Sequence, residues 1–154
     1  MVNNFGTLVI RIYPCLNYYV EYAAYKNKPN MENLILEPTN NTPTVIFDKE
    51  GKLLMEGRSL PENSAKFFMP LIEWGADLAG EEVKLVINLE YLNSSSTKKL
   101  LELLKVLDAN GKIRTLYIDW YYEVDDEDIL ENGQIFEEIL RKAQFRYHEY
   151  SRAA

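Results

Sequence analysis

The order of apolar patterns along the chain predicts an α/β two-layer sandwich whose sheet carries its helices mainly on one face. Two segments, residues 83–91 and 114–122, alternate with period two, and each is followed by apolar residues at helical spacing. Another helical pattern precedes the first of these segments. Because crossovers between parallel strands are right-handed, helices that connect strands added in one direction lie on the same face of the sheet.

The first predicted elements are a β-hairpin and a helix. Residues 44–48 and 53–57 are apolar runs on either side of Lys49-Glu-Gly-Lys52, and a glycine in so short a connection is typical of a hairpin turn. An antiparallel hairpin beside parallel strands makes the sheet mixed. Pro61 fits the first turn of a helix, which we expect to continue to about Leu78.

A strand and a second helix follow. The odd-numbered residues of 83–91 are apolar or aromatic and the residues between them are mostly polar, so we expect one face of this strand to be buried. Leucines at helical spacing predict a helix from Ser96 to Ala109. Asn110-Gly111 supplies residues suited to a left-handed stop at its end.

The last third of the chain predicts a strand, a helix and an edge strand. Residues 114–122 alternate, and Asp125-Asp-Glu-Asp128 opens a helical pattern where the helix dipole favours acidic side chains. This acidic run lacks the glycine and the spaced terminal glutamate of a calcium loop, so we expect no metal site. Residues 145–150 fit a short edge strand.

The length and composition of the chain indicate one domain. A chain of 154 residues suits a single core. Residues 1–30 are rich in tyrosine, follow no clear period and carry three basic residues and one acid, whereas the remainder carries 14 basic and 23 acidic residues. We expect residues 31–150 to form the domain and residues 1–30 to be an extension outside it, with Met31 as the candidate natural start.

The charge and the single cysteine exclude several classes of function. The net charge of -7 repels the phosphates of nucleic acids and of anionic membranes, so neither is an expected partner. Cys15 alone can form neither an intrachain disulfide nor a thiolate metal cage, which fits a cytoplasmic protein. No apolar run reaches the roughly 20 residues that span a bilayer. No nucleotide-binding motif is present, and we expect no cofactor.

Four hydroxyl residues in a row, Ser94 to Thr97, occupy the predicted turn between a strand and a helix. One hydroxyl can cap a helix by accepting a bond from an unpaired amide, which contributes about 1 kcal/mol. Four leave hydroxyls to spare beside amides and a helix dipole that also stabilise a phosphate. The residues alone therefore leave two readings open, a phosphorylation site and a merely polar turn.

Three segments resemble the signature blocks of the SiaC-type family of bacterial regulatory phosphoproteins. They are Gly57-Arg-Ser-Leu-Pro-Glu-Asn63, Leu89-Glu-Tyr-Leu-Asn-Ser-Ser-Ser96 and Trp120-Tyr-Tyr-Glu-Val-Asp-Asp-Glu-Asp128. The resemblance implies a STAS-like domain whose phosphoacceptor directly follows the asparagine of the second block, which is Ser94 here. The family often has threonine at this place, so Ser95 and Ser96 stay alternative acceptors.

The same resemblance implies the partners and the rest of the site. It implies a serine/threonine protein kinase, an opposing PP2C-like phosphatase and a diguanylate cyclase that the unphosphorylated form activates. The chain itself would then be a cytoplasmic binding switch and not an enzyme. The residues that the resemblance suggests for partner binding are Arg58, Glu62, Asn63, Asn93 and Ser95.

Two other functions stay open at this point. A small acid–base hydrolase would use carboxylates such as Asp119 and Glu123 in a deep pocket. A Ser-His-Asp triad would depend on His148, the one histidine, without any nucleophile-elbow motif. A constitutive interaction scaffold would need no modification at all. A shallow surface around Ser94 favours the switch over the hydrolase.

Overall fold

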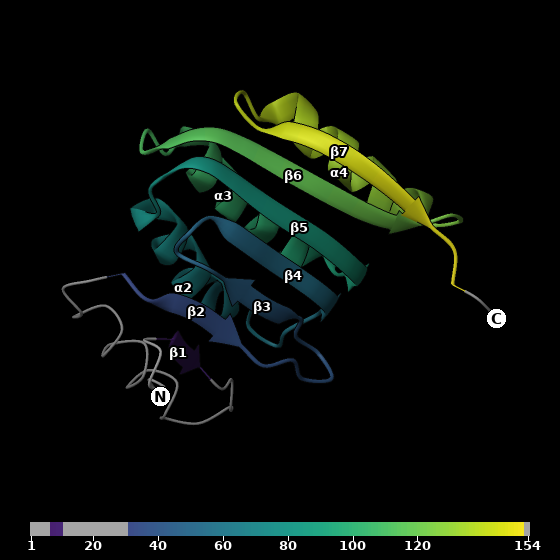
Figure 1. Cartoon of the computed structure of the whole chain (residues 1–154). Helices are drawn as coiled ribbons and strands as arrows, with labels where there is room; N and C mark the ends of the chain where they lie inside the picture. The colour runs from purple at the N-terminus through teal and green to yellow at the C-terminus, as the bar shows by residue number, and fades with distance from the viewer. Residues whose placement is uncertain (1–6, 11–30, 153–154) are drawn as a thin grey trace.

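A computed structural model describes the backbone of residues 7–10 and the whole of residues 31–152 (Figure 1). In chain order the elements are β1 (Thr7–Ile10), β2 (Asn33–Leu36), β3 (Thr44–Phe47), β4 (Lys52–Ser59), α2 (Ser64–Asp77), β5 (Gly80–Leu92), α3 (Ser94–Ala109), β6 (Ile113–Glu123), α4 (Glu127–Ile139) and β7 (Gln144–Tyr150). None of these described helices is long and apolar enough to cross a membrane.

The strands form one seven-stranded mixed sheet whose spatial order equals their order in the sequence. β3 is antiparallel to β2 and β4, while β4, β5, β6 and β7 are parallel and are joined by α2, α3 and α4. Since each crossover adds a strand in the same direction, all three helices cover the same face (Figure 1). The predicted α/β two-layer fold is confirmed.

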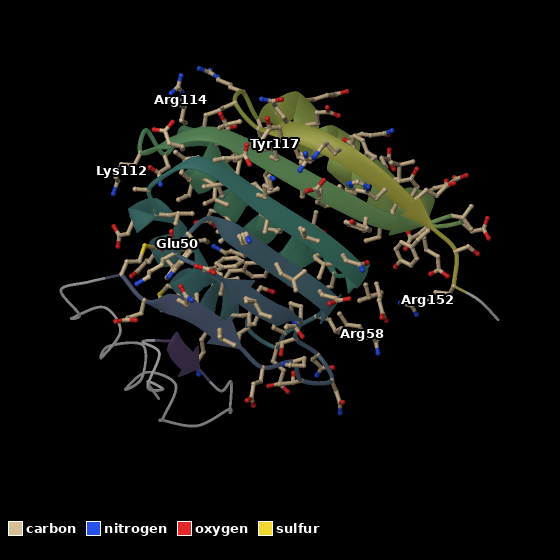
Figure 2. The ribbon with its side chains drawn as sticks, viewed as in Figure 1. Glu50, Arg58, Lys112, Arg114, Tyr117 and Arg152 are labelled. Carbon is tan, nitrogen blue, oxygen red and sulfur yellow. The ribbon has the colours of Figure 1, made fainter. Side chains whose placement is uncertain are left out.

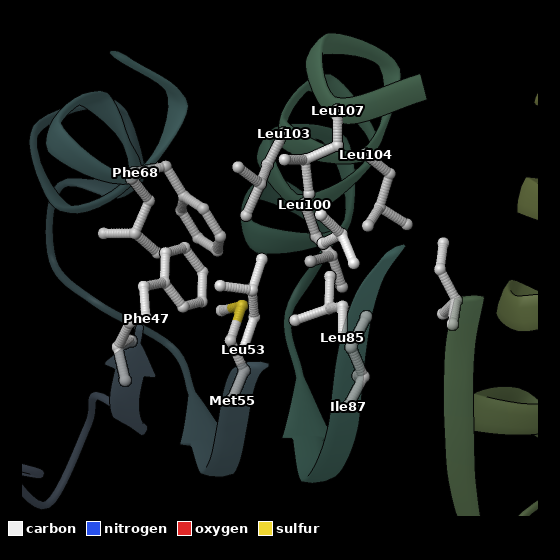
Figure 3. Close-up of a cluster of buried hydrophobic side chains, with 14 of the residues drawn as sticks. Phe47, Leu53, Met55, Phe68, Leu85, Ile87, Leu100, Leu103, Leu104 and Leu107 are labelled. Carbon is white, nitrogen blue, oxygen red and sulfur yellow. The ribbon is translucent and has the colours of Figure 1, made fainter. Parts of the chain in front are cut away.

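The core lies between the sheet and its helices. Trp74, Phe68 and Phe47 pack at the α2 end of this layer, and Trp120 packs under α4. Figure 3 shows the middle of the layer, where four leucines of α3 fill the space between the helices and the sheet, with Leu103 and Leu107 next to Gly75 of α2. The predicted one-sided burial of β5 and β6 is confirmed, because their alternate residues are buried against the helices.

Two described strands were not predicted from the sequence. β2 is too short for an alternating pattern to stand out, although it pairs with both β1 and β3. β1 lies within residues 1–30 and pairs with β2 in parallel. Apart from this strand, residues 1–30, including Cys15, lie outside the described residues.

The helix starts differ from the predicted ones because asparagine side chains cap them. α2 begins at Ser64 and not near Pro61, since the backbone N–H of Lys66 donates to the side-chain oxygen of Asn63 at 3.0 Å. α3 begins at Ser94, two residues earlier than predicted, because Asn93 serves as its cap.

The predicted left-handed stop after α3 was wrong. Asn110 has φ -70° and ψ 106°, and Gly111 is not among the described glycines with positive φ. Instead, the side-chain nitrogen of Asn110 donates to the carbonyls of Gly75 and Leu78 at 2.9 and 2.7 Å. The end of α3 is therefore set by contacts with the end of α2. The hairpin turn was predicted correctly, with Gly51 at φ 99°.

Replacing Gly133 by alanine tests how tightly α4 packs on the sheet. An added Cβ would lie 2.8 Å from the ring of Trp120, whose Nε1 donates to the carbonyl of Ile129 at 3.0 Å and which is buried. Because the ring is held in place, Gly133→Ala should lower the free energy of unfolding by about 1–3 kcal/mol in urea titrations.

Gly111→Ala is the matched control, because nothing lies within 4 Å of its added Cβ. Its free energy of unfolding should stay within about 0.5 kcal/mol of the parent value. Equal stability of the two variants would contradict the close packing of α4 on Trp120.

Candidate functional site

The predicted site segments meet at one edge of the sheet. Because β4, β5 and β6 are parallel, their carboxyl ends lie at the same edge, and α2, α3 and α4 each begin there. Backbone and side-chain contacts join residues 57–64 to residues 89–96. The backbone N–H of Asn93 donates to the carbonyl of Ser59 at 3.1 Å, and the hydroxyls of Ser64 and Ser95 lie 2.7 Å apart.

Three of the four consecutive hydroxyls have partners. Ser96 is fully buried, and its hydroxyl accepts a hydrogen bond from the Ser59 hydroxyl at 3.1 Å. Thr97 donates to the backbone carbonyl of Asn93 at 3.0 Å. Ser95 is exposed, yet its hydroxyl bonds to Ser64 and donates to the side chain of Asn93 at 3.2 Å. These hydroxyls hold the two helix starts and β4 together.

Ser94 is the exception in this run. It is the first residue of α3, its side chain is exposed, and within residues 31–152 its hydroxyl forms no hydrogen bond. The backbone N–H of Ser96 donates to the side-chain oxygen of Asn93 at 2.9 Å, so the helix cap is this asparagine and no serine is needed for it. Ser94 thus presents an exposed hydroxyl at a helix start, where the helix dipole favours negative charge.

The residues that were predicted to bind partners fall into two groups. In the first group, the side-chain oxygens of Asn63 and Asn93 cap α2 and α3, and the hydroxyl of Ser95 bonds to Ser64. Arg58 and Glu62 are exposed at the same edge, and Figure 2 shows Arg58 at the carboxyl end of β4. Its guanidinium carbon lies 5.8 Å from the ring centre of Tyr91, a cation–π contact.

Two exposed apolar residues of this edge were not predicted. Tyr91 and Val124, at the carboxyl ends of β5 and β6, are 48% and 47% exposed. The alternation of β5 placed Tyr91 on the buried face, but the register shifts after Gly57, so that Arg58 pairs with Tyr91 and Glu90 is skipped. The glycine within the strand is the sequence signal that could have indicated this bulge.

The carboxylates of the hydrolase hypothesis do not share a pocket. Asp119 accepts two hydrogen bonds from Arg146 and bonds to His148, at 2.7–2.8 Å. Burial alone would raise the pKa of Asp119, but the bonds to Arg146 and His148 outweigh it and hold the pKa below its usual value. Glu123 instead lines an open hollow of about 470 Å³ together with four acidic residues of the α4 start.

The other catalytic and metal arrangements find no support among the described residues. No serine hydroxyl within residues 31–152 is hydrogen-bonded to His148, whose ring stacks on Tyr121 at 4.5 Å. In the same part of the chain, no group of three or more histidine, cysteine, aspartate or glutamate side chains could hold a metal ion.

Comparison with known proteins decides the family. The model of a family described as "SiaC family regulatory phosphoprotein" matches residues 36–150, which include all three signature blocks. The chain belongs to the SiaC family. A protein of Pseudomonas aeruginosa (strain UCBPP-PA14), described as uncharacterized, is 32% identical over 113 residues, which cover 70% of this chain and 90% of the relative.

Solved structures of the family have the same fold. SiaC of Pseudomonas aeruginosa matches with a TM-score of 0.64 and 27% identity, over 78% of this chain and 100% of that one. A second match, with a TM-score of 0.62 and 27% identity, is from a crystal structure of the diguanylate cyclase SiaD in complex with its activator SiaC. It covers 73% of this chain and 96% of that chain.

Alanine variants of neighbouring serines test the hydroxyl contacts. Ser96→Ala leaves the buried Ser59 hydroxyl without a partner, so the free energy of unfolding should fall by about 1–3 kcal/mol in urea titrations. Ser94→Ala removes an exposed hydroxyl with no partner among the described residues, so it should change the free energy of unfolding by less than about 0.5 kcal/mol. A loss as large for Ser94→Ala as for Ser96→Ala would contradict this assignment.

Proposed function

We propose that this member of the SiaC family is a binding switch controlled by reversible phosphorylation of Ser94. The observation that carries the proposal is the division of roles within the hydroxyl run. Ser94 alone in this run is exposed and without a hydrogen bond among the described residues. It also occupies the place that the family resemblance assigns to the phosphoacceptor.

The geometry ranks the alternative acceptors. A kinase must bring the hydroxyl to a γ-phosphate, and the fully buried Ser96 could reach one only if the start of α3 opened. Ser95 is exposed, but its phosphorylation would break the contact with Ser64 that joins the starts of α2 and α3. Ser94 requires neither change and is therefore the preferred acceptor.

A phosphate on Ser94 would alter the surface and leave the fold in place. It adds a charge of about -1.5 to -2 at the first position of α3, where the amides and dipole of the helix favour an anion. The contacts of Ser95, Ser96 and Thr97 do not involve the Ser94 side chain. A partner that docks over this edge would meet added bulk and charge.

The partners follow from the family. A serine/threonine kinase and a PP2C-like phosphatase would add and remove the phosphate, and both would act in the cytoplasm, where ATP is available. The output partner would be a diguanylate cyclase that binds the unphosphorylated form, since a SiaC of Pseudomonas aeruginosa is known in complex with the cyclase that it activates. Arg58, Glu62 and Tyr91 are exposed at the same edge of the sheet as Ser94 and would contact the cyclase.

Phosphate localisation tests the acceptor. Protein isolated from its native cells, with phosphatase activity inhibited, is digested and analysed by tandem mass spectrometry. We expect phosphate on Ser94, its loss from the Ser94→Ala variant and its retention in Ser95→Ala, because the Ser94 hydroxyl alone is unengaged in this run. Phosphate on Ser96 with Ser94 unmodified would contradict the proposal.

Binding measurements test the switch. A diguanylate cyclase of the same organism is titrated with the Ser94→Ala and Ser94→Asp variants. Because the aspartate places a charge where the partner docks, the dissociation constant of Ser94→Asp should be about tenfold higher than that of Ser94→Ala. Phosphate carries more charge than aspartate, so phosphorylation should weaken binding at least as much. Lys105→Ala, which also changes the net charge by one unit, serves as the control and should keep the parent affinity, because Lys105 is exposed on α3 far from its first turn. Equal affinities of the two Ser94 variants would indicate a constitutive scaffold instead.

A further inference from the structure

The sheet face opposite the helices is not covered by any described element. Figures 1 and 2 view the sheet from this side, with α2, α3 and α4 behind it. The buried core residues of the strands all point to the helices, so their neighbours in sequence point to this open face. An open face of this kind is usually lined by polar side chains.

An apolar row crosses this face over four strands. Ile35 of β2 is paired with Ile46 of β3, Ile46 with Leu54 of β4, and Leu54 with Val86 of β5. Ile46 is 40% exposed, and the other three are partly exposed. Paired residues of neighbouring strands lie on the same face, so these four side chains form one continuous apolar line.

Opposite charges flank the row at equal distances. Two residues before it lie Lys52 of β4 and Lys84 of β5, which are paired, and two residues after it lie Glu56 and Asn88, which are also paired. Lys52 and Glu56 are exposed and form no ion pair within residues 31–152. Lys84 is ion-paired with Glu82 of its own strand at 3.0 Å, so the flanking charges left without a partner in the described part of the chain are Lys52 on one side and Glu56 on the other.

We propose that this open face binds the open face of a second copy of the chain about a twofold axis along the apolar row. Such an axis lays the row of Ile35, Ile46, Leu54 and Val86 onto itself and reverses the strand direction between the copies. Lys52 of each copy then lies over Glu56 of the other, so both charges of the flanks are paired. Two sheets packed in this way are about 10 Å apart, a distance that lysine and glutamate side chains bridge.

A buried acceptor on the same face supports this arrangement. The side-chain oxygen of Asn88 is buried without a hydrogen-bond partner in the described part of the chain. The twofold axis that pairs Lys52 with Glu56 brings Lys84 of the copy over Asn88. Lys84 is ion-paired with Glu82 of its own chain at 3.0 Å, but its ammonium has further hydrogens to donate, and one of them reaches the Asn88 oxygen when that side chain turns toward the copy. Beyond β5 the row is no longer apolar: Asp119 of β6 follows Val86 and is bonded to Arg146 of its own chain.

The size of the patch sets the expected affinity. Four strands about 4.8 Å apart and about 17 Å long give a contact of about 300 Å², which is small for a specific interface. We therefore expect a reversible dimer with a dissociation constant of about 10–100 µM. The strand reversal leaves the two Ser94 edges at opposite ends of the dimer and free of the interface.

Charge exchange tests the proposal. In sedimentation equilibrium of the full chain from about 1 to about 500 µM, Lys52→Glu should raise the dissociation constant about tenfold, because it places two glutamates over two others. Glu56→Lys should do the same by placing lysine over lysine. The double variant Lys52→Glu/Glu56→Lys restores both pairs and should return to within about threefold of the parent.

Lys105→Glu is the control for net charge. It lies exposed on α3, on the helix side of the sheet, and changes the net charge by the same amount as Lys52→Glu, so the dimer should persist unchanged. A parent chain that stays monomeric at about 500 µM would overturn the proposal. So would a double variant that dimerises no better than either single one, because Lys52 would then not face Glu56.

Discussion

Capping of the helix starts is the constraint on which the site depends. A helix leaves its first amides without intrahelical partners, and here three described helices begin at the same sheet edge. The side chains of Asn63, Asn93 and Asp126 accept from the amides of α2, α3 and α4. Because an asparagine caps α3, the hydroxyls that follow it are released for other roles.

Those hydroxyls hold the elements of this edge together, and the Ser94 hydroxyl alone in the run takes no part. Ser59 and Ser96 join β4 to α3 in the buried layer, while Ser64 and Ser95 join the two helix starts at the surface. Ser94 takes no part in these contacts. In the proposed function, a phosphate on Ser94 would act on what docks at this edge and would leave the fold unchanged. The proposed regulatory surface is therefore separate from the apolar layer that stabilises the domain.

The sequence predicted what depends on periodicity and left open what depends on distant contacts. Residues 83–91 and 114–122 reveal β5 and β6 because one of their faces is buried, and the crossover rule then places the helices. The alternation placed Tyr91 on the buried face, which was wrong, because its exposure results from a register shift against β4. The freedom of Ser94 was equally hidden, because the partners of Ser95 and Ser96 lie 31 and 37 residues away in the sequence.

Amide hydrogen exchange of the unmodified and Ser94-phosphorylated protein tests most directly whether the switch acts on the surface alone. We expect protection in the first turns of α2 and α3 to be retained or raised, because the capping and hydroxyl contacts persist and the phosphate lies at the positive end of α3. Loss of protection at the start of α3 on phosphorylation would contradict it, since the switch would then work by unfolding this edge.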